Sequence, residues 1–589
     1  MNDPVTLDHY STTGRRWLAK TISELAWEGV FAATENCLEL ASGVVYTYSS
    51  TRRIWDNLDI EPESLLRDGK VPDPLQFIID ARTEMAMSPA TEAMFIREVK
   101  NTLRQDCAIE ARWGGLSASE LAALPTNELH AALCGHPKAV ANKGRLGWGL
   151  DDHAAYAPEN AAPIRLEWLA LDRTHVVTGR GAAIEEGDLL RSAIGAEEFA
   201  RLEKAAGDGD RVLMPVHPWQ WDNCLAQSLV ADLAAGRARY LGAYGPEFVA
   251  SPSLRTLVPR DGGPYEVKLA LAILNTSAWR GMPGKYIAQG AAISDWLAGI
   301  LADDPVTAAR VTVQREVLGL WWNDPLMAQA PDAPYRWHET LGAIWRETGE
   351  SRLPGRQVLM TAALFHEGAD GLPLAAAFAQ KAGLSIEDWL RRLFSVSVLP
   401  LWHILCKYGL GFIAHGQNIN VVLEGHVPVG ITVKDFQGDL DLVDRDFPES
   451  DSLPDAARAI LPRKPPAYIV HNIQTAHFVT VLRFLSAGLA RRSVIDEARF
   501  YAVLRDCLMA HAAAHPDLSE RFALFDLFSA EMPRVAINRV RFQIGYEDSA
   551  SRPLPARGVD LANPLAEPDT DDLRHAAGCN HSDKVSAVQ

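Results

Sequence analysis

The sequence predicts an α+β protein, because helical and strand-like spacings of apolar residues occupy different parts of the chain. Apolar side chains recur at helical spacing near the N-terminus and again after about residue 345. Between these parts the period falls to two, and Val267, Leu269 and Leu271 alternate with Lys268 and Ala270. This order predicts an antiparallel, sheet-rich middle domain between two mostly helical ones.

The first domain, residues 1–145, is predicted to be helical. Leu18, Ile22 and Leu25 lie at intervals that place them on one face of a helix, and a second such series runs from Met94 to Leu103. Thr126 is an expected N-cap of a later helix, because its hydroxyl can accept a free N–H of the first turn.

The middle domain, residues 146–345, is predicted to consist of strands with helical inserts. Ile164, Leu166 and Trp168 alternate with charged residues, as expected for a strand with one buried face. The stretch 291–301 has the composition of a helical insert.

The third domain, residues 346–566, is predicted to be mostly helical around one β-hairpin. Helices are expected at 385–408 and 467–491, and the hairpin at 418–435. Two β-branched runs flank Gly425-His426, a dipeptide compatible with a tight turn. Residues 567–589 are polar without a hydrophobic period, so we expect a disordered tail.

The net charge narrows the range of partners. The 589 residues include 57 Lys and Arg against 75 Asp and Glu, a formal charge of −18. This acid excess argues against nucleic acid and against a membrane surface as partners, since binders of both need positive faces. A small anionic substrate stays compatible, because a local cluster of cations can overrule the global charge.

Cysteine usage and hydropathy predict a soluble, cytoplasmic protein. The seven cysteines are far apart and include no Cys-x-x-Cys pair, so neither a disulfide framework nor a structural zinc site is indicated. The N-terminus has no basic stretch followed by an apolar core, as a signal peptide would. Pro400, His403 and Lys407 interrupt the most apolar segment, residues 396–413.

The strongest local signal for chemistry is the predicted hairpin. Pairing around its turn brings Asn418 and Asp435 to the open end, with His415 just outside. Carboxylate and carboxamide oxygens are suitable ligands for the Mg²⁺ of a nucleotide phosphate. The alternative is an ordinary hairpin with polar end-caps.

A second signal is a set of cations and hydroxyls around the predicted strands of the middle domain. It comprises Ser253, Arg255, Thr256, Lys268, Thr276 and Arg280. Together these groups suit a polyphosphate or a polycarboxylate. Solvated charges on a sheet face are the alternative.

Two weaker signals lie earlier in the chain. The loop from Gly135 to Gly149 carries His136 and Lys143 but matches no Walker or dinucleotide-binding spacing, so a solvated loop explains it nearly as well. His217-Pro218-Trp219-Gln220-Trp221 follows a predicted strand, and its histidine and tryptophans favour structural roles.

Familiar enzyme motifs give partial matches. The chain has no Gly-x-Ser-x-Gly elbow and no His-Glu-x-x-His, so hydrolases lack support. The His-Gly…Asn hairpin followed by Asp435-Phe436-x-Gly438 resembles the catalytic loop and metal-binding Asp of kinase-like phosphotransferases. Their catalytic Asp is missing, since Gln417 stands in that neighbourhood and cannot act as a base. A plain kinase is therefore disfavoured.

Taken together, these segments resemble the IucA/IucC family, the NRPS-independent siderophore (NIS) synthetases. The matching pieces keep the family's order: His136-Pro137…Lys143-x-Arg145, His217-Pro218-Trp219, Ser253-x-Arg255-Thr256, Lys268-Leu269 with Thr276-Ser277-Ala278-x-Arg280, His415-Gly416-Gln417-Asn418, Lys434-Asp435-Phe436-x-Gly438 and Asn563-Pro564-Leu565. The resemblance covers roughly residues 130–565. Each motif is weak alone, but their order and spacing are specific.

The resemblance implies a cupped-hand architecture of thumb, fingers and palm, with ATP and Mg²⁺ as cofactors and a homodimer. It implies that ATP adenylates a carboxylate, which then forms an amide with an amine or N-hydroxy-diamine. By resemblance, the ATP phosphates are held by Ser253, Arg255, Thr256 and Lys268, with help from His136 and Lys143, and the nucleotide and its Mg²⁺ are served by Asn418 and Asp435. The residues that face the carboxylate are Thr276, Arg280 and His415. The catalytic groups are Lys268, Arg280 and His415.

The substrate class stays open at this point. The Gly416 form of the histidine motif and the run from Lys434 to Leu440 resemble members that act on a citrate monoamide or a succinyl-hydroxamate. A citrate-condensing enzyme is the first alternative. A kinase-like phosphotransferase and a nucleotide-binding protein without turnover are the competing functions.

Overall fold

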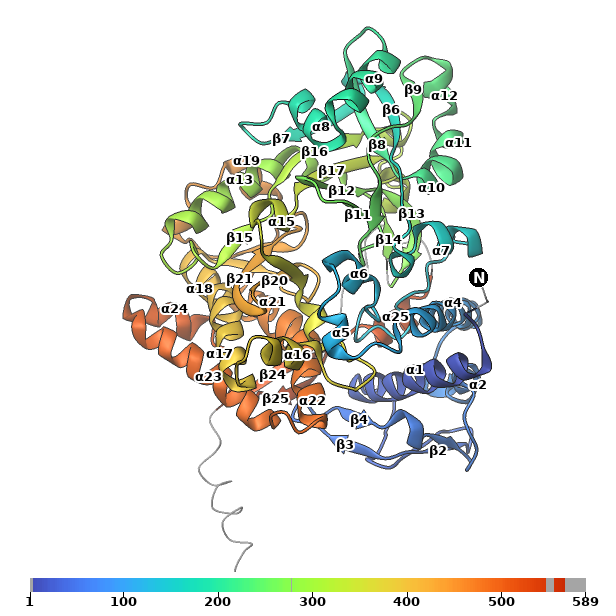
Figure 1. Ribbon diagram of the computed structural model, residues 1–589, viewed down its shortest axis with the longest axis vertical. Helices are drawn as coiled ribbons and strands as arrows, with labels where there is room; N and C mark the ends of the chain where they lie inside the picture. The colour runs from blue at the N-terminus through green and yellow to red at the C-terminus, as the bar shows by residue number, and fades with distance from the viewer. Residues whose placement is uncertain (1–3, 277, 547–555, 567–589) are drawn as a thin grey trace, which may run out of the picture.

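The computed structural model describes residues 4–276, 278–546 and 556–566, and it confirms the mixed α+β class. The N-terminal part lies beside the C-terminal helices, and the sheet-rich middle part rises above both (Figure 1). Ser277 and the predicted tail from residue 567 onward lie outside the described residues. The domain limits near residues 145 and 345 stay a prediction.

The N-terminal part is built on two long helices. Thr6 caps the first by accepting from the His9 amide, and Ser88 caps the other with Pro89 as its first residue. The helices of this part are α1 (Leu7–Trp27), α2 (Pro74–Asp80), α3 (Arg82–Met85), α4 (Pro89–Trp113), α5 (Ala118–Leu121) and α6 (Thr126–Ala131). Thr126 is the first residue of α6 and Pro125 its N-cap position, so the predicted cap is wrong.

The expectation that this part is purely helical is also wrong. Five short strands lie between α1 and α2: β1 (Cys37–Glu39), β2 (Val45–Thr47), β3 (Ser50–Arg52), β4 (Leu58–Ile60) and β5 (Leu66–Arg67). Each has two or three residues, too few for an alternating pattern to be recognised in the sequence. They form small antiparallel sheets against α1.

The middle part contains the predicted antiparallel sheets. One sheet has three strands in the order β8 (Arg211–Val216), β6 (Glu167–Asp172), β9 (Ala238–Ala243). A second has six strands in the order β10 (Phe248–Ala250), β11 (Thr256–Pro259), β12 (Tyr265–Leu269), β17 (Gly342–Glu347), β16 (Glu316–Trp322), β7 (Val176–Arg180). In addition, β13 (Leu271–Asn275) pairs with β14 (Ala278–Arg280). Short helices surround the sheets: α7 (Leu150–Tyr156), α8 (Glu186–Ile194), α9 (Ala196–Ala206), α10 (Pro218–Gln220), α11 (Ala226–Ser228), α12 (Val230–Ala234) and α14 (Tyr335–His338).

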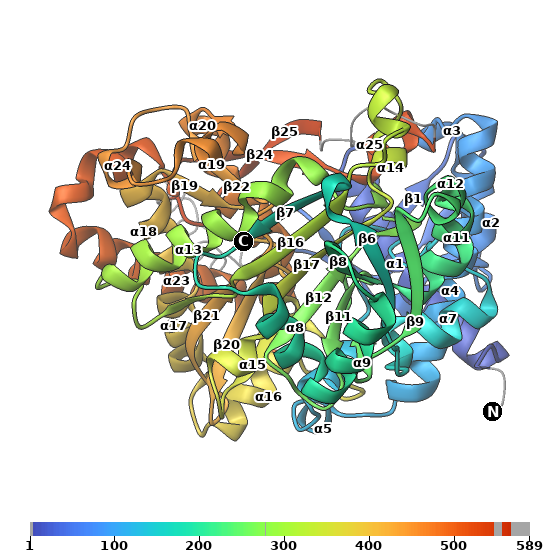
Figure 2. The same cartoon turned by 90° about the horizontal axis from the view of Figure 1, so that it is seen from above.

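The predicted helical insert is α13 (Ile287–Asp303), which packs on β7 and β16. A Cβ at Gly179 of β7 would lie 1.9 Å from the Ile287 carbonyl oxygen, so this approach of helix to sheet requires glycine. In Figure 2 the six-stranded sheet crosses the centre, with the C-terminal helices on the left and the N-terminal helices on the right.

The C-terminal part is mostly helical, as predicted. Its main helices are α16 (Leu374–Lys381), α17 (Ile386–Val396), α18 (Val398–Tyr408), α22 (Arg483–Arg491), α23 (Glu497–Ala514) and α24 (Ser519–Leu524); shorter ones are α15 (Gly349–Arg352), α19 (Asp455–Ile460), α20 (Pro466–Ile469) and α21 (His471–Ile473). The helix expected at 385–408 is divided at Ser397, and the one expected at 467–491 contains a π-helical stretch, Gln474–Leu482.

The predicted hairpin is formed by β20 (Ile419–Glu424) and β21 (Val427–Val433). Gly425 and His426 both have positive φ, 55° and 69°, as a type I′ turn requires. The hairpin is the centre of a sheet ordered β15 (Val311–Val313), β21, β20, β18 (Gln357–Met360), so it joins strands from both sides of the predicted boundary at 345. A neighbouring sheet has the order β19 (Leu410–Phe412), β22 (Leu440–Val443), β23 (Arg463–Lys464).

The end of the described chain returns to the N-terminal part. β24 (Glu531–Ala536) pairs with β25 (Ala556–Ala562), and Phe542 of α25 (Asn538–Ile544) packs edge-on against Phe95 of α4. Within the described residues, no helix combines the length and apolar character that a membrane span requires.

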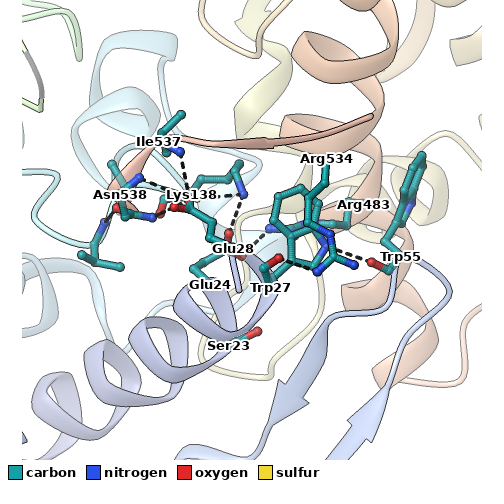
Figure 3. A network of polar contacts seen from close by, with 12 residues as sticks. Ser23, Glu24, Trp27, Glu28, Trp55, Lys138, Arg483, Arg534, Ile537 and Asn538 are labelled. Carbon is teal, nitrogen blue, oxygen red and sulfur yellow. Dashed lines mark hydrogen bonds and ion pairs between the residues drawn. The ribbon is translucent and has the colours of Figure 1, made fainter. Parts of the chain in front are cut away.

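A buried ion network ties these regions together (Figure 3). Glu24 of α1 accepts from Lys138 Nζ at 2.8 Å and from Arg483 of α22. Glu28 accepts from Asn538 Nδ2 at 2.9 Å. The side chains of Glu24, Lys138 and Arg483 are at most 3% exposed. Two cations thus share one buried carboxylate beside the loop that carries His136.

We expect Glu24→Gln to destabilise the fold strongly, because it removes the carboxylate that contacts both Lys138 and Arg483 and leaves them only Glu28, which lies 3.9 Å from Lys138 Nζ. Such a loss costs about 3–5 kcal/mol of unfolding free energy. Urea denaturation measures it, with Glu63→Gln as the control. Glu63 pairs with Arg15 but is 68% exposed, so its loss costs at most about 1 kcal/mol. Equal effects of the two variants would contradict the role given to the network.

Candidate active site

The six-stranded sheet presents a charged face towards the β20–β21 hairpin. Thr256 pairs with Lys268, Glu266 with Arg346, and Glu316 with the same Arg346 across adjacent strands. Side chains alternate along a strand, so these residues share one face. The intervening residues Leu257, Val267, Leu269, Leu318 and Trp345 belong to the hydrophobic core on the other face.

Asp435 connects this face to the hairpin. It follows β21 after Lys434, and its Oδ1 lies 2.5 Å from Lys268 Nζ and 2.6 Å from Arg346 Nη1. Burial opposes its ionisation, but Arg346 and Lys268 hold the pKa of Asp435 well below its usual range. Its φ of 63° is uncommon for a residue with a side chain and accompanies the turn away from β21.

The sequence motifs did not single out several residues that lie beside Asp435. Arg346 Nε donates to Glu266 at 2.5 Å, and Gln437 Nε2 donates to Glu316 Oε2 at 2.8 Å. Burial raises the pKa of Glu316, while Lys268 and Arg346 oppose that shift. A weak signal was present, since Glu316 begins the otherwise apolar strand β16 and Arg346 follows the apolar residues 343–345 of β17.

The oxygen atoms here suit a hard cation. Among the described residues, Glu316 Oε1 and Gln437 Oε1 are buried without a hydrogen-bond partner. With the Asp435 carboxylate they form a set of oxygen donors of the kind that Mg²⁺ prefers. Asn418, the other predicted metal ligand, donates instead to Asp439 Oδ2 at 2.9 Å. Asn418 and Asp435 therefore lie at the same end of the hairpin but have different partners.

The predicted phosphate-binding residues occupy one turn and the adjoining strand. Ser253 Oγ accepts from the Thr256 amide at 3.2 Å, and Leu254 between them has a φ of 71°. The Arg255 guanidinium donates to the Gly281 carbonyl, just beyond β14. The turn thus brings Arg255 towards the strand end at Arg280.

The predicted carboxylate-binding residues lie on the β13–β14 hairpin and on the loop before β20. Arg280 Nη2 donates to Thr276 Oγ1 and, at 2.8 Å, to the Asn275 carbonyl. His415 Nδ1 accepts from the Gln417 amide at 3.2 Å. Burial lowers the pKa of His415, so the ring is neutral at pH 7, and the neutral ring carries its proton on Nε2.

The His136 loop approaches the same place. Desolvation lowers the pKa of His136 to about 3, although the residue retains contact with solvent. Lys20 and Arg280 are among the cations that lower this pKa further, and His415 also contributes. His136 therefore lies within electrostatic range of two predicted substrate-binding residues. Lys143 is buried and contacts Asp106 at 2.7 Å, the Cys134 carbonyl and Asn142, which holds the loop.

The structural interpretation of the His217 segment is supported. His217 is fully buried and its Nδ1 accepts from the Trp219 amide at 3.1 Å, while Trp219 belongs to a hydrophobic cluster. Trp221 stacks on Tyr240 with 4.2 Å between ring centroids. The segment supports the sheet that bears the site.

The fold and the candidate site together show an antiparallel sheet whose cationic face meets an acidic hairpin end. Two family models match parts of the chain. The model described as IucA / IucC family matches residues 127–366, and the one described as Ferric iron reductase FhuF-like transporter matches residues 387–550.

Full-length relatives identify the family. The chain is 40% identical to the aerobactin synthase of Escherichia coli, over 94% of this chain and 98% of that protein. It is 35% identical to the rhizobactin siderophore biosynthesis protein RhbF of Rhizobium meliloti, over 94% and 96%. The solved structure of aerobactin synthetase IucC from a hypervirulent pathotype of Klebsiella pneumoniae matches with a TM-score of 0.85 and 36% identity, over 95% of this chain and 98% of that one.

The chain belongs to the IucA/IucC family, as its motifs predicted. These relatives are proteins of siderophore synthesis, and this chain is an enzyme of the same biosynthetic class.

The two cations on Asp435 should differ in their effect on stability. Arg346→Met leaves Glu266 and Asp435 without their shared guanidinium, and we expect a loss of about 3–5 kcal/mol. Lys268→Met leaves Arg346 on Asp435 and removes an ammonium whose pKa burial lowers, so the loss should be smaller. Urea denaturation of both variants tests this order. A larger loss for Lys268→Met would contradict it.

Proposed function

We propose that this enzyme is an ATP-dependent acid–amine ligase of siderophore synthesis, forming AMP and pyrophosphate. The observation that carries the proposal is the meeting of Lys268 on the sheet face with Asp435 at the hairpin end. Arg255 lies in the turn before β11, and Arg280 is the last residue of β14. This arrangement provides cations for two anionic substrates and oxygen donors for the metal that accompanies a nucleotide.

The nucleotide phosphates would contact Ser253, Arg255, Thr256 and Lys268. Mg²⁺ would be held by Asp435, with Asn418 and the unpartnered oxygens of Glu316 and Gln437 as further donors. When bound, it offsets the negative charge of the phosphates. Lys268 then exchanges part of its contact with Asp435 for phosphate oxygens, which a flexible ammonium can do without losing its charge.

The carboxylate is a poor electrophile and is activated first. Its oxygen attacks the α-phosphorus of ATP, the bond to the β-phosphate oxygen breaks, and an acyl-adenylate and pyrophosphate result. Lys268, Arg255 and Arg280 offset the repulsion between the two anions as they approach. The amine then attacks the activated carbonyl, loses a proton and releases AMP, a step favoured by correct positioning.

His415 is suited to bind the carboxylate rather than to act as a base. Its Nδ1 accepts from the Gln417 amide, so the neutral ring offers an Nε2–H donor. With Arg280 and Thr276 it would orient the carboxylate towards the α-phosphate. We assign no general base.

Three acids are proposed: a citrate monoamide, free citrate or a succinyl-hydroxamate. The amine is proposed to be an N-hydroxy-diamine or a related amine. A panel of these acids and amines with product mass spectrometry distinguishes them. A kinase-like phosphotransferase is the competing function, based on the Asp435-Phe436-x-Gly438 segment.

The nucleotide product separates these functions. With ATP, Mg²⁺, a matching acid and amine, we expect AMP and pyrophosphate in equal amounts with the amide. Chromatography of the nucleotides measures this. ADP as the product would contradict the ligase and favour the phosphotransferase.

Arg280→Ala should reduce carboxylate-dependent pyrophosphate release by about 100-fold or more, the scale of losing one stabilising donor. ATP binding, measured by calorimetry, should change only a few-fold, because Arg280 is assigned to the acid. Arg260→Ala is the matched control; Arg260 follows β11, pairs with Glu247 and is 48% exposed. An equal loss of ATP binding in Arg280→Ala would overturn this division of roles.

A further inference from the structure

Three histidines gather where two helices of the C-terminal part meet the end of α13. His403 lies on α18, His511 near the end of α23, and His515 follows α23. None of them belongs to the candidate active site. His403 interrupts the most apolar segment of the sequence, where a buried imidazole has to satisfy both ring nitrogens.

The ring nitrogens of the three histidines lie close together. One ring nitrogen from each histidine lies within 4.8 Å of the others, and His403 Nδ1 is 3.2 Å from His511 Nε2. Zinc–nitrogen bonds of about 2.0–2.1 Å in a tetrahedron put two ligand nitrogens about 3.3 Å apart. The first two rings therefore already have the separation of ligands to one ion. His515 is partly exposed, so its ring can rotate to close the remaining gap.

The outer contacts leave the required nitrogens available. His403 Nε2 lies 3.2 Å from the Asp304 carboxylate, so it carries the proton and leaves Nδ1 with a lone pair. His515 Nδ1 lies 2.9 Å from the His511 carbonyl oxygen and can donate to it. With the proton on Nδ1, the Nε2 atom of His515 keeps its lone pair. A carboxylate or carbonyl behind a histidine is the usual support of a metal ligand.

One carboxylate and two cations lie near the cluster. Asp304 is fully buried and also accepts from Lys407 Nζ at 2.5 Å and from Tyr408 Oη at 3.1 Å. Arg310 lies within electrostatic range of His511. Metal binding here would therefore depend on the three ring nitrogens and not on an excess of negative charge.

We propose that His403, His511 and His515 bind one Zn²⁺ ion, with water in the fourth position. Three imidazoles suit Zn²⁺ rather than Mg²⁺, which prefers oxygen ligands. His511 lies in the last turn of α23 and His515 at the C-cap position that follows it, and their ring centroids are 4.2 Å apart. The ion links α18 to α23 and, through His403 and Asp304, to the end of α13. The site is thus separate in chemistry and position from the proposed magnesium site.

A neutral hydrogen bond between His403 and His511 is the alternative explanation of their 3.2 Å contact. It does not require His515, whereas the metal site does. His515→Ala therefore distinguishes the two, and because His515 is partly exposed at a helix end, this variant is the mildest of the three.

The test uses the full-length protein after treatment with a chelator and its removal. Calorimetric titration with Zn²⁺ should show one ion per chain, and Co²⁺ should give the intense visible bands of tetrahedral coordination. His515→Ala should weaken Zn²⁺ binding at least tenfold, whereas His175→Ala, a matched histidine of the middle part, should leave it unchanged. Mg²⁺ should not compete.

Three results would overturn the proposal. The first is the absence of saturable Zn²⁺ binding by the wild-type chain, and the second is unchanged binding by His515→Ala. The third is a loss of binding in His415→Ala, which would place the ion at the active site instead. Protection of His515 from carbethoxylation by bound Zn²⁺, read by peptide mass spectrometry, checks the site without any substitution.

Discussion

The pairing of Asp435 with Lys268 and Arg346 is the interaction on which the site depends. It joins the end of the β20–β21 hairpin to the charged face of the six-stranded sheet, two elements that are far apart in the chain. A buried carboxylate between two cations keeps its charge, and that charge keeps both cations in place. In the proposed function, substrate binding would exchange partners among charges that are already buried together.

The Glu24 network performs a comparable task for the His136 loop. Lys138 stands two residues from His136 and is held by Glu24 of α1, which also accepts from Arg483 of α22 (Figure 3). Because a broken buried ion pair costs several kcal/mol, the loop, the N-terminal helix and the C-terminal helices behave as one unit. The approach of His136 towards His415 and Arg280 follows from this anchoring.

Elements with a long hydrophobic period could be predicted from the sequence, and short ones could not. The α13 insert, the hairpin and the alternation in β12 all extend over five residues or more, which is enough for a pattern. The strands between Cys37 and Arg67 are shorter, and the break at Ser397 falls inside a continuous apolar run. Arg346 and Glu316 were missed because their importance comes from strand pairing, and Gln437 because it occupies the unspecified position of the Lys434-Asp435-Phe436-x-Gly438 motif.

By itself, the sequence determined the fold class, the family and the residue types of the site, since motif order and alternation survive in a one-dimensional string. Tertiary structure alone decided which charges are partners: Asp435 with Lys268 and Arg346, Asn418 with Asp439, and Lys143 with Asp106. The same holds for His403 of α18, which only the fold brings next to His511 and His515 at the end of α23. Coulombic and coordinate bonds act over a few ångströms in space, and spacing along the chain does not encode that distance.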